Sequence, residues 1–144
     1  MVSATDELAD YSVSIETRVH SHYRDGVVSI GTLVELFGMA GGKLAYLFDG
    51  DAGLLRVFED LEFLAPVYDG DYVRVTARLR SVGRTSRRRL FEAHVTARTE
   101  GVGTAPTHGE LLDPPLLIAR ASAVSVTPQD RQRITPARFA VKDR

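Results

Sequence analysis

The sequence predicts an α+β fold in which an antiparallel sheet wraps around one long central helix. A long stretch, residues 30–48, carries apolar side chains at helical spacing. One alternating segment precedes it and a run of such segments follows, which gives the order β-α-β-β-β-β. Residues 58–71 indicate a strand that ends at a proline, a turn at Asp69-Gly70 and the start of the next strand.

The elements before this turn follow from simple patterns. Residues 11–19 alternate between apolar and polar side chains and predict a half-buried strand, followed by a polar loop over residues 20–26. The helix over residues 30–48 is apolar on most of its surface, so we expect it to be buried on most sides. Three glycines within it each cost about 1 kcal/mol against alanine, which is tolerable where the sheet or a partner chain packs closely: Gly38, Gly41 and Gly42.

The remaining elements are strands joined by turn residues. Strands are expected over residues 54–64, 72–82, 86–99 and 116–126. Residues 100–115 are rich in Gly, Thr and Pro and predict an irregular loop. Residues 127–144 are polar and basic and predict either a loose tail or a surface wrap.

Length and composition indicate one ordinary globular domain. We expect a single domain over residues 1–144, with a core at about 10–127 and a polar tail at 128–144. A net charge of −1 suggests neither a nucleic-acid partner nor a membrane surface. The absence of Cys excludes disulfides and thiol nucleophiles, and four scattered His form no metal-site pattern. No signal peptide or membrane span is recognisable, so we expect a cytoplasmic protein.

Because a single sheet of this kind leaves an open edge and a thin core, we expect at least a homodimer, or a higher homo-oligomer, paired edge to edge.

Four sequence blocks carry a resemblance to a known family, and together they span most of residues 15–132. The third block is the most specific. The blocks are His22-Tyr23 with Leu36-Phe37-Gly38; Phe48-Asp49-Gly50-Asp51 with Gly53-Leu54; Glu62-Phe63-Leu64-Ala65-Pro66-Val67-Tyr68 with Gly70-Asp71; and Val82-Gly83 with Thr85-Ser86-Arg87 and Phe91-Glu92-Ala93. On these motifs the chain resembles the 3-aminobutyryl-CoA ammonia-lyases of the hot-dog (thioesterase/dehydratase) superfamily.

The resemblance implies a hot-dog fold and a carbon–nitrogen lyase. Such an enzyme converts a 3-aminoacyl-CoA to the enoyl-CoA and an amine, or runs the reverse Michael addition at C3. Coenzyme A would be part of the substrate, with no further cofactor. Two alternatives stay open: a thioesterase acting on acyl-CoA or acyl carrier protein thioesters, and a non-catalytic protein that binds acyl thioesters.

The chain also departs from the family pattern. The family has carboxylates where this chain has His20, Ser29, Met39 and Lys43. It has two glycines at the positions of Arg24 and Asp25. These changes favour a relative that handles a different amine or acyl chain.

Amine elimination needs a base for the C2 proton, a stabilised thioester oxygen and an acid for the leaving amine. The resemblance implies that the start of the central helix points its N–H groups at the carbonyl, which places Val28 and Ser29 at the substrate through their backbone. Ser29 is alternatively a plain N-cap. The catalytic candidates are His22, Asp25, Glu35 and Glu62.

Each carboxylate candidate has a structural alternative. Asp25 either caps the helix or serves as the base. Glu35 is either a buried base with a raised pKa or a residue of the exposed stripe or of the dimer seam. Glu62 either faces a partner's helix or forms a salt bridge to Arg74 or Arg78.

The predicted substrate-binding residues fall in two groups. His20 and Tyr23 accompany His22 in the loop before the helix. Arg84, Ser86 and Arg87 belong to an arginine-rich hairpin that could bind the phosphates of coenzyme A or an acidic carrier protein. A solvated, charged edge strand is the alternative for this second group.

Overall fold

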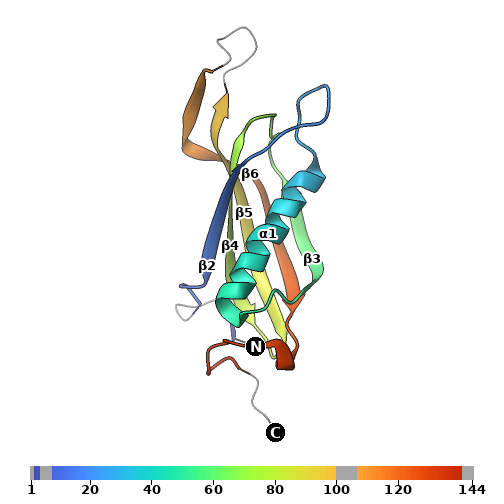
Figure 1. Cartoon of the computed structure of the whole chain (residues 1–144), viewed down its shortest axis with the longest axis vertical. Coiled ribbons are helices and arrows are strands. Elements are labelled where there is room, and N and C mark those ends of the chain that lie inside the picture. The colour runs from blue at the N-terminus through green and yellow to red at the C-terminus, as the bar shows by residue number, and fades with distance from the viewer. Residues whose placement is uncertain (1, 4–7, 100–106, 141–144) are drawn as a thin grey trace.

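The computed structural model describes residues 2–3, 8–99 and 107–140. In this part of the chain, six strands form one antiparallel sheet that curls around a single α-helix (Figure 1). The elements are β1 (Val2–Ser3), β2 (Ser12–Arg18), α1 (Ile30–Asp49), β3 (Leu54–Phe63), β4 (Tyr72–Val82), β5 (Ser86–Thr99), β6 (Gly109–Val126) and a 3-10 turn (Gln129–Arg131). The predicted α+β hot-dog architecture is confirmed.

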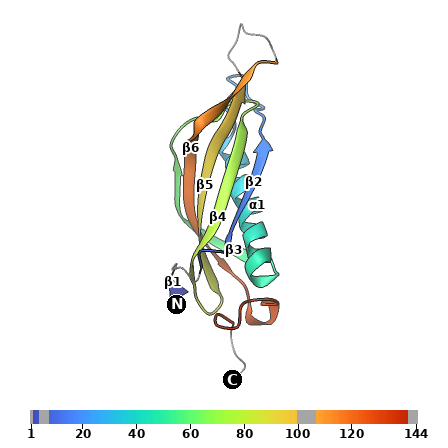
Figure 2. The same cartoon turned by 90° about the vertical axis from the view of Figure 1, so that its left-hand side faces the viewer.

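The strand order places β2 and β3 at opposite edges of the sheet. β4, β5 and β6 lie between them, and both β2 and the short β1 pair with β4. Figure 2 shows α1 lying along one face of this sheet, with the other face uncovered. No helix within the described residues is long and apolar enough to cross a membrane.

Helix α1 begins and ends at residues suited to those positions. Ser29 is the N-cap, and its Oγ accepts a hydrogen bond from the Thr32 N–H at 3.2 Å. Gly50 ends the helix with φ 71°, a left-handed conformation that costs glycine little. Apart from Asp49 at the C-terminal end, the face toward the sheet is apolar: Leu33, Leu36, Phe37, Ala40, Leu44 and Phe48 are all buried.

The core lies between α1 and the central strands. The buried side chains of β4 and of β5 beside it form the sheet side of this core: Val73, Val75, Ala77 and Leu79, with Phe91, Ala93 and Val95. Aromatic contacts join the two layers: Phe37 lies 5.5 Å from Phe91, and Tyr11 meets Phe48 edge-on at 5.0 Å. The alternation of β4 therefore places its apolar side chains in the core and its polar side chains on the other face of the sheet.

Strand β6 is longer than predicted. It begins at Gly109, where the sequence suggested a loop as far as residue 115. Residues 109–111 pair with 97–99 of β5, so the hairpin extends beyond the main sheet, with a register shift near Val95. Pro114 and Pro115 made this strand look like a loop in the sequence, because proline has no backbone N–H to donate to a neighbouring strand. The rest of the predicted loop, residues 100–106, lies outside the described residues.

The segment after β6 wraps around the end of α1. The N–H groups of Arg133 and Ile134 donate to the Asp49 carbonyl, and the ring of Phe139 packs 5.6 Å from Phe48. Phe139 is 7% exposed and belongs to the core. The surface-wrap alternative is therefore correct for residues 127–140, and the loose-tail alternative is wrong there.

Candidate active site

An apolar pocket of about 300 Å³ lies beside the N-terminus of α1. The segment entering the helix forms one wall, and the segment leaving β3 forms the other. The Val28 N–H donates to the Val67 carbonyl at 2.7 Å, which holds the two segments side by side. The prediction that this N–H points at the substrate carbonyl is therefore wrong, and Val28 contributes to the pocket as a lining residue. The lining residues are Val27, Val28, Ile30 and Leu33 on one side and Phe63, Leu64, Ala65, Pro66 and Val67 on the other. The second wall comes from the most specific of the four sequence blocks.

The helix end beside this pocket offers hydrogen-bond donors. Ser29 Oγ satisfies the Thr32 N–H, but Ile30 and Gly31 come earlier and their N–H groups have no acceptor within the helix. The dipole of the 20-residue helix adds partial positive charge at this end. An oxygen that develops negative charge would be stabilised here.

A carboxylate that the sequence marked only as part of a turn organises the loop over residues 20–26. Asp69 Oδ1 accepts the Ser21 N–H at 2.7 Å and lies 3.4 Å from His20 Nδ1. The Ser21 N–H, helped by His20, holds the pKa of Asp69 below its usual range. Asp69 thus ties the predicted binding residue His20 to the turn before β4.

Three predicted residues lie in this loop with exposed side chains: His22, Tyr23 and Asp25. Asp25 Oδ1 accepts the Val27 N–H at 3.0 Å, so it fixes the turn that leads into the pocket wall. His22 and Tyr23 lie at the loop tip, and neither side chain lines the pocket in the single chain. Their roles in binding or proton transfer stay predictions.

The two other candidate carboxylates lie apart from this loop. Glu35 is exposed in the second turn of α1, so the hypothesis of a carboxylate buried within one chain is wrong. Glu62 lies on the uncovered face of the sheet and pairs with Arg120 at 3.2 Å, not with the expected Arg74 or Arg78. The structure of one chain therefore does not bring Glu62 together with His22.

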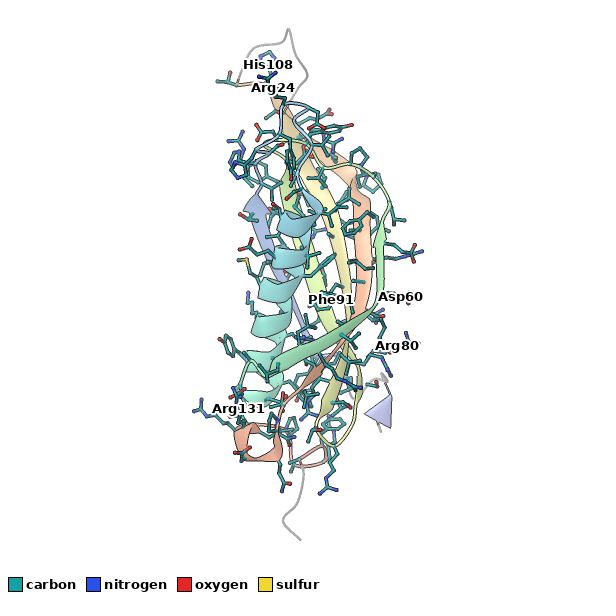
Figure 3. All side chains as sticks on the ribbon, turned by 90° about the vertical axis from the view of Figure 1, so that its right-hand side faces the viewer. Arg24, Asp60, Arg80, Phe91, His108 and Arg131 are labelled. Carbon is teal, nitrogen blue, oxygen red and sulfur yellow. The ribbon has the colours of Figure 1, made fainter. Side chains whose placement is uncertain are left out.

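The uncovered sheet face carries its own shallow pocket, also about 300 Å³, lined by charged side chains that include Asp60, Glu62, Arg78, Arg80 and Arg120. In Figure 3, Asp60 and Arg80 point away from α1. This face is therefore separate from the helix N-terminus.

The arginine-rich hairpin lies at the opposite end of α1, which is about 30 Å long. Arg84 is exposed there and Ser86 is half-buried, so both remain available for contacts. The prediction for Arg87 is wrong. Its guanidinium is buried and donates from Nε and Nη2 to both oxygens of Asp49, at 2.8 and 3.0 Å. Its Nη1 donates to two backbone carbonyls, so this side chain holds the fold together.

The arginines of this hairpin do not form one patch, because alternate residues of a strand point to opposite faces. Arg88 points to the uncovered face, where it pairs with Glu59 at 2.6 Å. Arg87 and Arg89 point toward the helix and are buried. Among the described residues, no group of three or more His, Asp or Glu is placed to hold a metal ion.

Comparison with known proteins agrees with this geometry. The model of the thioesterase superfamily matches residues 25–104, which is more than half of the chain. A 3-aminobutyryl-CoA ammonia lyase from Acetoanaerobium sticklandii is 36% identical over 115 residues, covering 78% of this chain and 89% of that protein.

Solved structures show the same fold. The β-alanyl-CoA:ammonia lyase from Clostridium propionicum superposes with a TM-score of 0.81 at 26% identity, covering 96% of this chain and 95% of that one. A hexameric thioesterase from Yersinia pestis gives a TM-score of 0.67 at 18% identity, covering 85% and 94% of the two chains, and this likeness concerns the fold alone.

Proposed function

The chain belongs to the thioesterase superfamily and, within it, to the family of the 3-aminobutyryl-CoA ammonia lyases, and on that premise we propose that it is a carbon–nitrogen lyase. It would remove ammonia or a small amine from C3 of a short 3-aminoacyl-CoA, or add the amine to the enoyl-CoA. The observation that carries this proposal is the apolar pocket at the free N–H groups of α1, walled by the most specific family block.

The pocket suits a short acyl thioester. The thioester carbonyl oxygen would accept hydrogen bonds from the N–H groups of Ile30 and Gly31, which would stabilise the enolate formed when C2 loses its proton. The amine leaves from its protonated, ammonium form: the C3–N bond breaks with its electron pair going to nitrogen, the electron pair of the enolate forms the C2–C3 double bond, and neutral ammonia leaves. A volume of about 300 Å³ is at the small end for ligand pockets, so the acyl chain would be short.

The departures from the family pattern leave this chemistry in place. Met39 is exposed, and Lys43 donates to the Ser14 carbonyl on the side of α1 toward β2, so neither lines the pocket. Ser29 keeps the N-cap role that a family aspartate would also fill. His20 is thus the one of the four changed carboxylate positions at which the replacement alters the chemistry of the loop before α1. It would favour a different amine or a different proton donor.

The proton-transfer roles are assigned by position. Glu35 and Asp25 are the carboxylates nearest the start of α1 along the chain, and we assign Glu35 as the base for the C2 proton. His22 would lie near the amine, with Tyr23 beside it as part of the pocket entrance. Glu62 would reach such a site only from a second copy, because it points away from α1 in its own chain.

The nucleotide part of coenzyme A would lie outside the pocket. Exposed basic side chains occur at the same end of the molecule, where Arg24 lies in the loop over residues 20–26 (Figure 3). Arg18 is also there, held by its hydrogen bond to the Gly70 carbonyl at 3.1 Å. Forked guanidinium groups bind phosphate well, and an acyl carrier protein would present acidic groups to the same surface.

A thioesterase is the second candidate, because the same N–H groups would stabilise the oxyanion formed when water attacks the carbonyl. The superfamily to which the chain belongs is named for thioesterases, whereas the likeness to the solved Yersinia pestis thioesterase is one of fold alone. The two activities differ in product: hydrolysis frees the thiol of coenzyme A, whereas amine chemistry keeps the thioester.

The test incubates the protein with 3-aminobutyryl-CoA. Mass spectrometry follows the thioester, and a thiol reagent detects any free coenzyme A in the same sample. The proposal expects the enoyl thioester and ammonia, with no free thiol. Glu35→Gln should lower kcat at least about a hundredfold if it is the base, while the matched control Glu59→Gln, on the uncovered sheet face, should keep the activity. Free thiol from the wild-type protein would favour the thioesterase, and tight binding without turnover would favour a binding protein.

A further inference from the structure

A second hollow, of about 490 Å³, lies at the end of the sheet where the β5–β6 hairpin extends beyond the other strands (Figure 1). Residues opposite one another in the strand ladders form one row across it: Arg18 of β2, Tyr72 of β4, Ala97 of β5 and Leu111 of β6. Tyr72 precedes the buried Val73, so this row lies on the uncovered face of the sheet. The hollow is therefore separate from the apolar pocket at the start of α1.

The row has large side chains at its walls and a small one at its floor. Ala97 lies between the Tyr72 ring, which is 41% exposed, and Leu111, which is 83% exposed. In the next pair along the hairpin, Gly109 lies opposite Thr99 and has no side chain to fill the hollow. A flat ring would fit over this floor, between one aromatic and one aliphatic wall, and Thr99 brings a hydroxyl group to the lining.

One end of the hollow carries a positive charge that is oriented but not neutralised. The Arg18 guanidinium lies over the Tyr72 ring, 5.8 Å from its centroid, and its Nε donates to the Gly70 carbonyl at 3.1 Å. Arg18 is exposed and forms no ion pair with a described residue. Its two Nη groups are therefore available to an anion.

The acidic residues at this end of the sheet do not occupy the hollow. Glu110 is the ladder partner of Arg98, and both alternate with residues of the row, so their side chains lie on the opposite face. On that face Arg98 pairs with the buried Asp71 at 2.9 Å. Asp69 is already held by its contacts to the loop before α1. Among the described lining residues, no acidic side chain therefore points into the hollow.

We propose that this hollow binds an adenine nucleotide, with the base over Ala97 between Tyr72 and Leu111 and a phosphate on the Arg18 guanidinium. Every base can stack on an aromatic ring, and a guanidinium binds phosphate through two parallel hydrogen bonds. A volume of about 490 Å³ is within the range of small-molecule sites.

Two sources supply such a ligand: coenzyme A, whose far end is an adenine nucleotide, and a free nucleotide. The first source rests on the proposed function, in which the substrate is a coenzyme A thioester. Val67, in the wall of the acyl pocket, is only five residues from Tyr72, so at most about 17 Å separates them. The pantetheine arm of coenzyme A spans a distance of this order. The binding chemistry in the hollow is the same for both sources.

Isothermal titration calorimetry with coenzyme A, adenosine 3′,5′-bisphosphate, AMP and adenosine tests the site. The bisphosphate should bind, and adenosine, which lacks the phosphate, should bind about tenfold or more weakly. Tyr72→Ala and Arg18→Gln should each weaken the bisphosphate about tenfold or more, whereas Tyr72→Phe keeps the ring and should keep the binding. Arg78→Gln is the matched control, because Arg78 is exposed on the same strand and face as Tyr72 but lies outside the hollow. Thermal unfolding without ligand checks the fold of each variant.

The order of affinities identifies the source. If coenzyme A supplies the nucleotide, coenzyme A and the bisphosphate compete for one site and both bind more tightly than AMP. If the ligand is a free nucleotide, AMP binds at least as tightly and coenzyme A does not displace it. Failure of all the nucleotides to bind, or binding that Tyr72→Ala and Arg18→Gln leave unchanged, would overturn the proposal. These titrations need no turnover, so they decide the site even if the chain lacks lyase activity.

Photolabelling locates the base independently of any variant. An azidoadenosine 3′,5′-bisphosphate, cross-linked by light and followed by digestion and mass spectrometry, should label Tyr72 or residues 107–111. Excess unmodified bisphosphate should prevent the labelling. A label confined to residues 20–33, in the loop before α1 or its first turn, would contradict the assignment of the hollow.

Discussion

Asp69 shows how one turn residue can organise a site. Its carboxylate accepts the Ser21 N–H and contacts His20, so it anchors the loop before α1. The sequence marked Asp69-Gly70 correctly as a turn but gave no sign of this contact, because the two segments are far apart in the chain. The loop positions of His20, His22 and Asp25 were likewise predictable, whereas their side-chain partners were not.

The lowered pKa of Asp69 leads to a pH-dependence prediction. Because folding lowers this pKa, the ionised carboxylate stabilises the folded state above the ordinary pKa of about 3.9. That contribution is lost as the pH falls through the lower, folded-state value. Asp69→Asn should therefore unfold at a lower temperature than the wild type at pH 7, and the difference should shrink below about pH 4. Asp10→Asn is the control, and a gap that persists in acid would contradict the assignment.

Ser29 provides a second test at this scale. Ser29→Ala removes the acceptor for the Thr32 N–H and should lower the free energy of unfolding by about 1 kcal/mol. Ser29→Asp restores an acceptor and should keep most of the stability. Urea denaturation of the three proteins measures the difference. Equal loss in both variants would show that the hydroxyl acts in some way other than as a cap.

At the scale of elements, the sequence predicted the helix and the central strands well. The bounds predicted from periodicity, 30–48, 72–82 and 86–99, agree with α1, β4 and β5 to within one residue. The expectation that α1 is buried on most sides is not met within one chain, where Met39, Tyr46 and Leu47 are exposed. The start of β6 was missed because its consecutive prolines resemble a loop. For residues 127–140 the sequence left two alternatives, a loose tail and a surface wrap. The contacts that hold this segment, to the Asp49 carbonyl and through the Phe139 ring, are single contacts that leave no repeating pattern in the sequence.

Asp49 and Arg87 join the end of α1 to β5, and Thr135 of the C-terminal segment also donates to this carboxylate. Asp49→Ala leaves the Arg87 guanidinium buried and unpaired, so it should destabilise the fold by about 3–5 kcal/mol. Urea denaturation gives this value. Glu59→Ala, which breaks the exposed pair with Arg88, is the matched control and should change stability little. Similar losses in both variants would mean that the buried pair contributes no more than a surface pair.

For the whole molecule, β3 is the element that a single chain leaves incomplete. It pairs with β6 along one edge, and its described ladders leave the other edge open. Large apolar side chains on it are exposed, among them Leu55 at 50% and Leu61 at 37%. Long, exposed apolar edge strands are unusual in monomers. The expected homo-oligomer would cover this strand.

Leu61→Lys places a charge in that interface and should dissociate the oligomer at micromolar concentration, as measured by light scattering after size exclusion. Leu111→Lys, in the far hairpin, is the matched control and should leave the mass unchanged. An oligomer that survives Leu61→Lys would place the subunit contact elsewhere than on β3.

The central claim concerns the bond that the protein makes or breaks. We would incubate crotonyl-CoA with the protein in the presence of ammonium, of glycine and of no amine, and follow the thioester by mass spectrometry. The account predicts a thioester heavier by one amine that forms only with protein and amine together, and the better amine would identify the physiological class. Free coenzyme A and crotonate in all three samples would contradict it and establish hydrolysis instead.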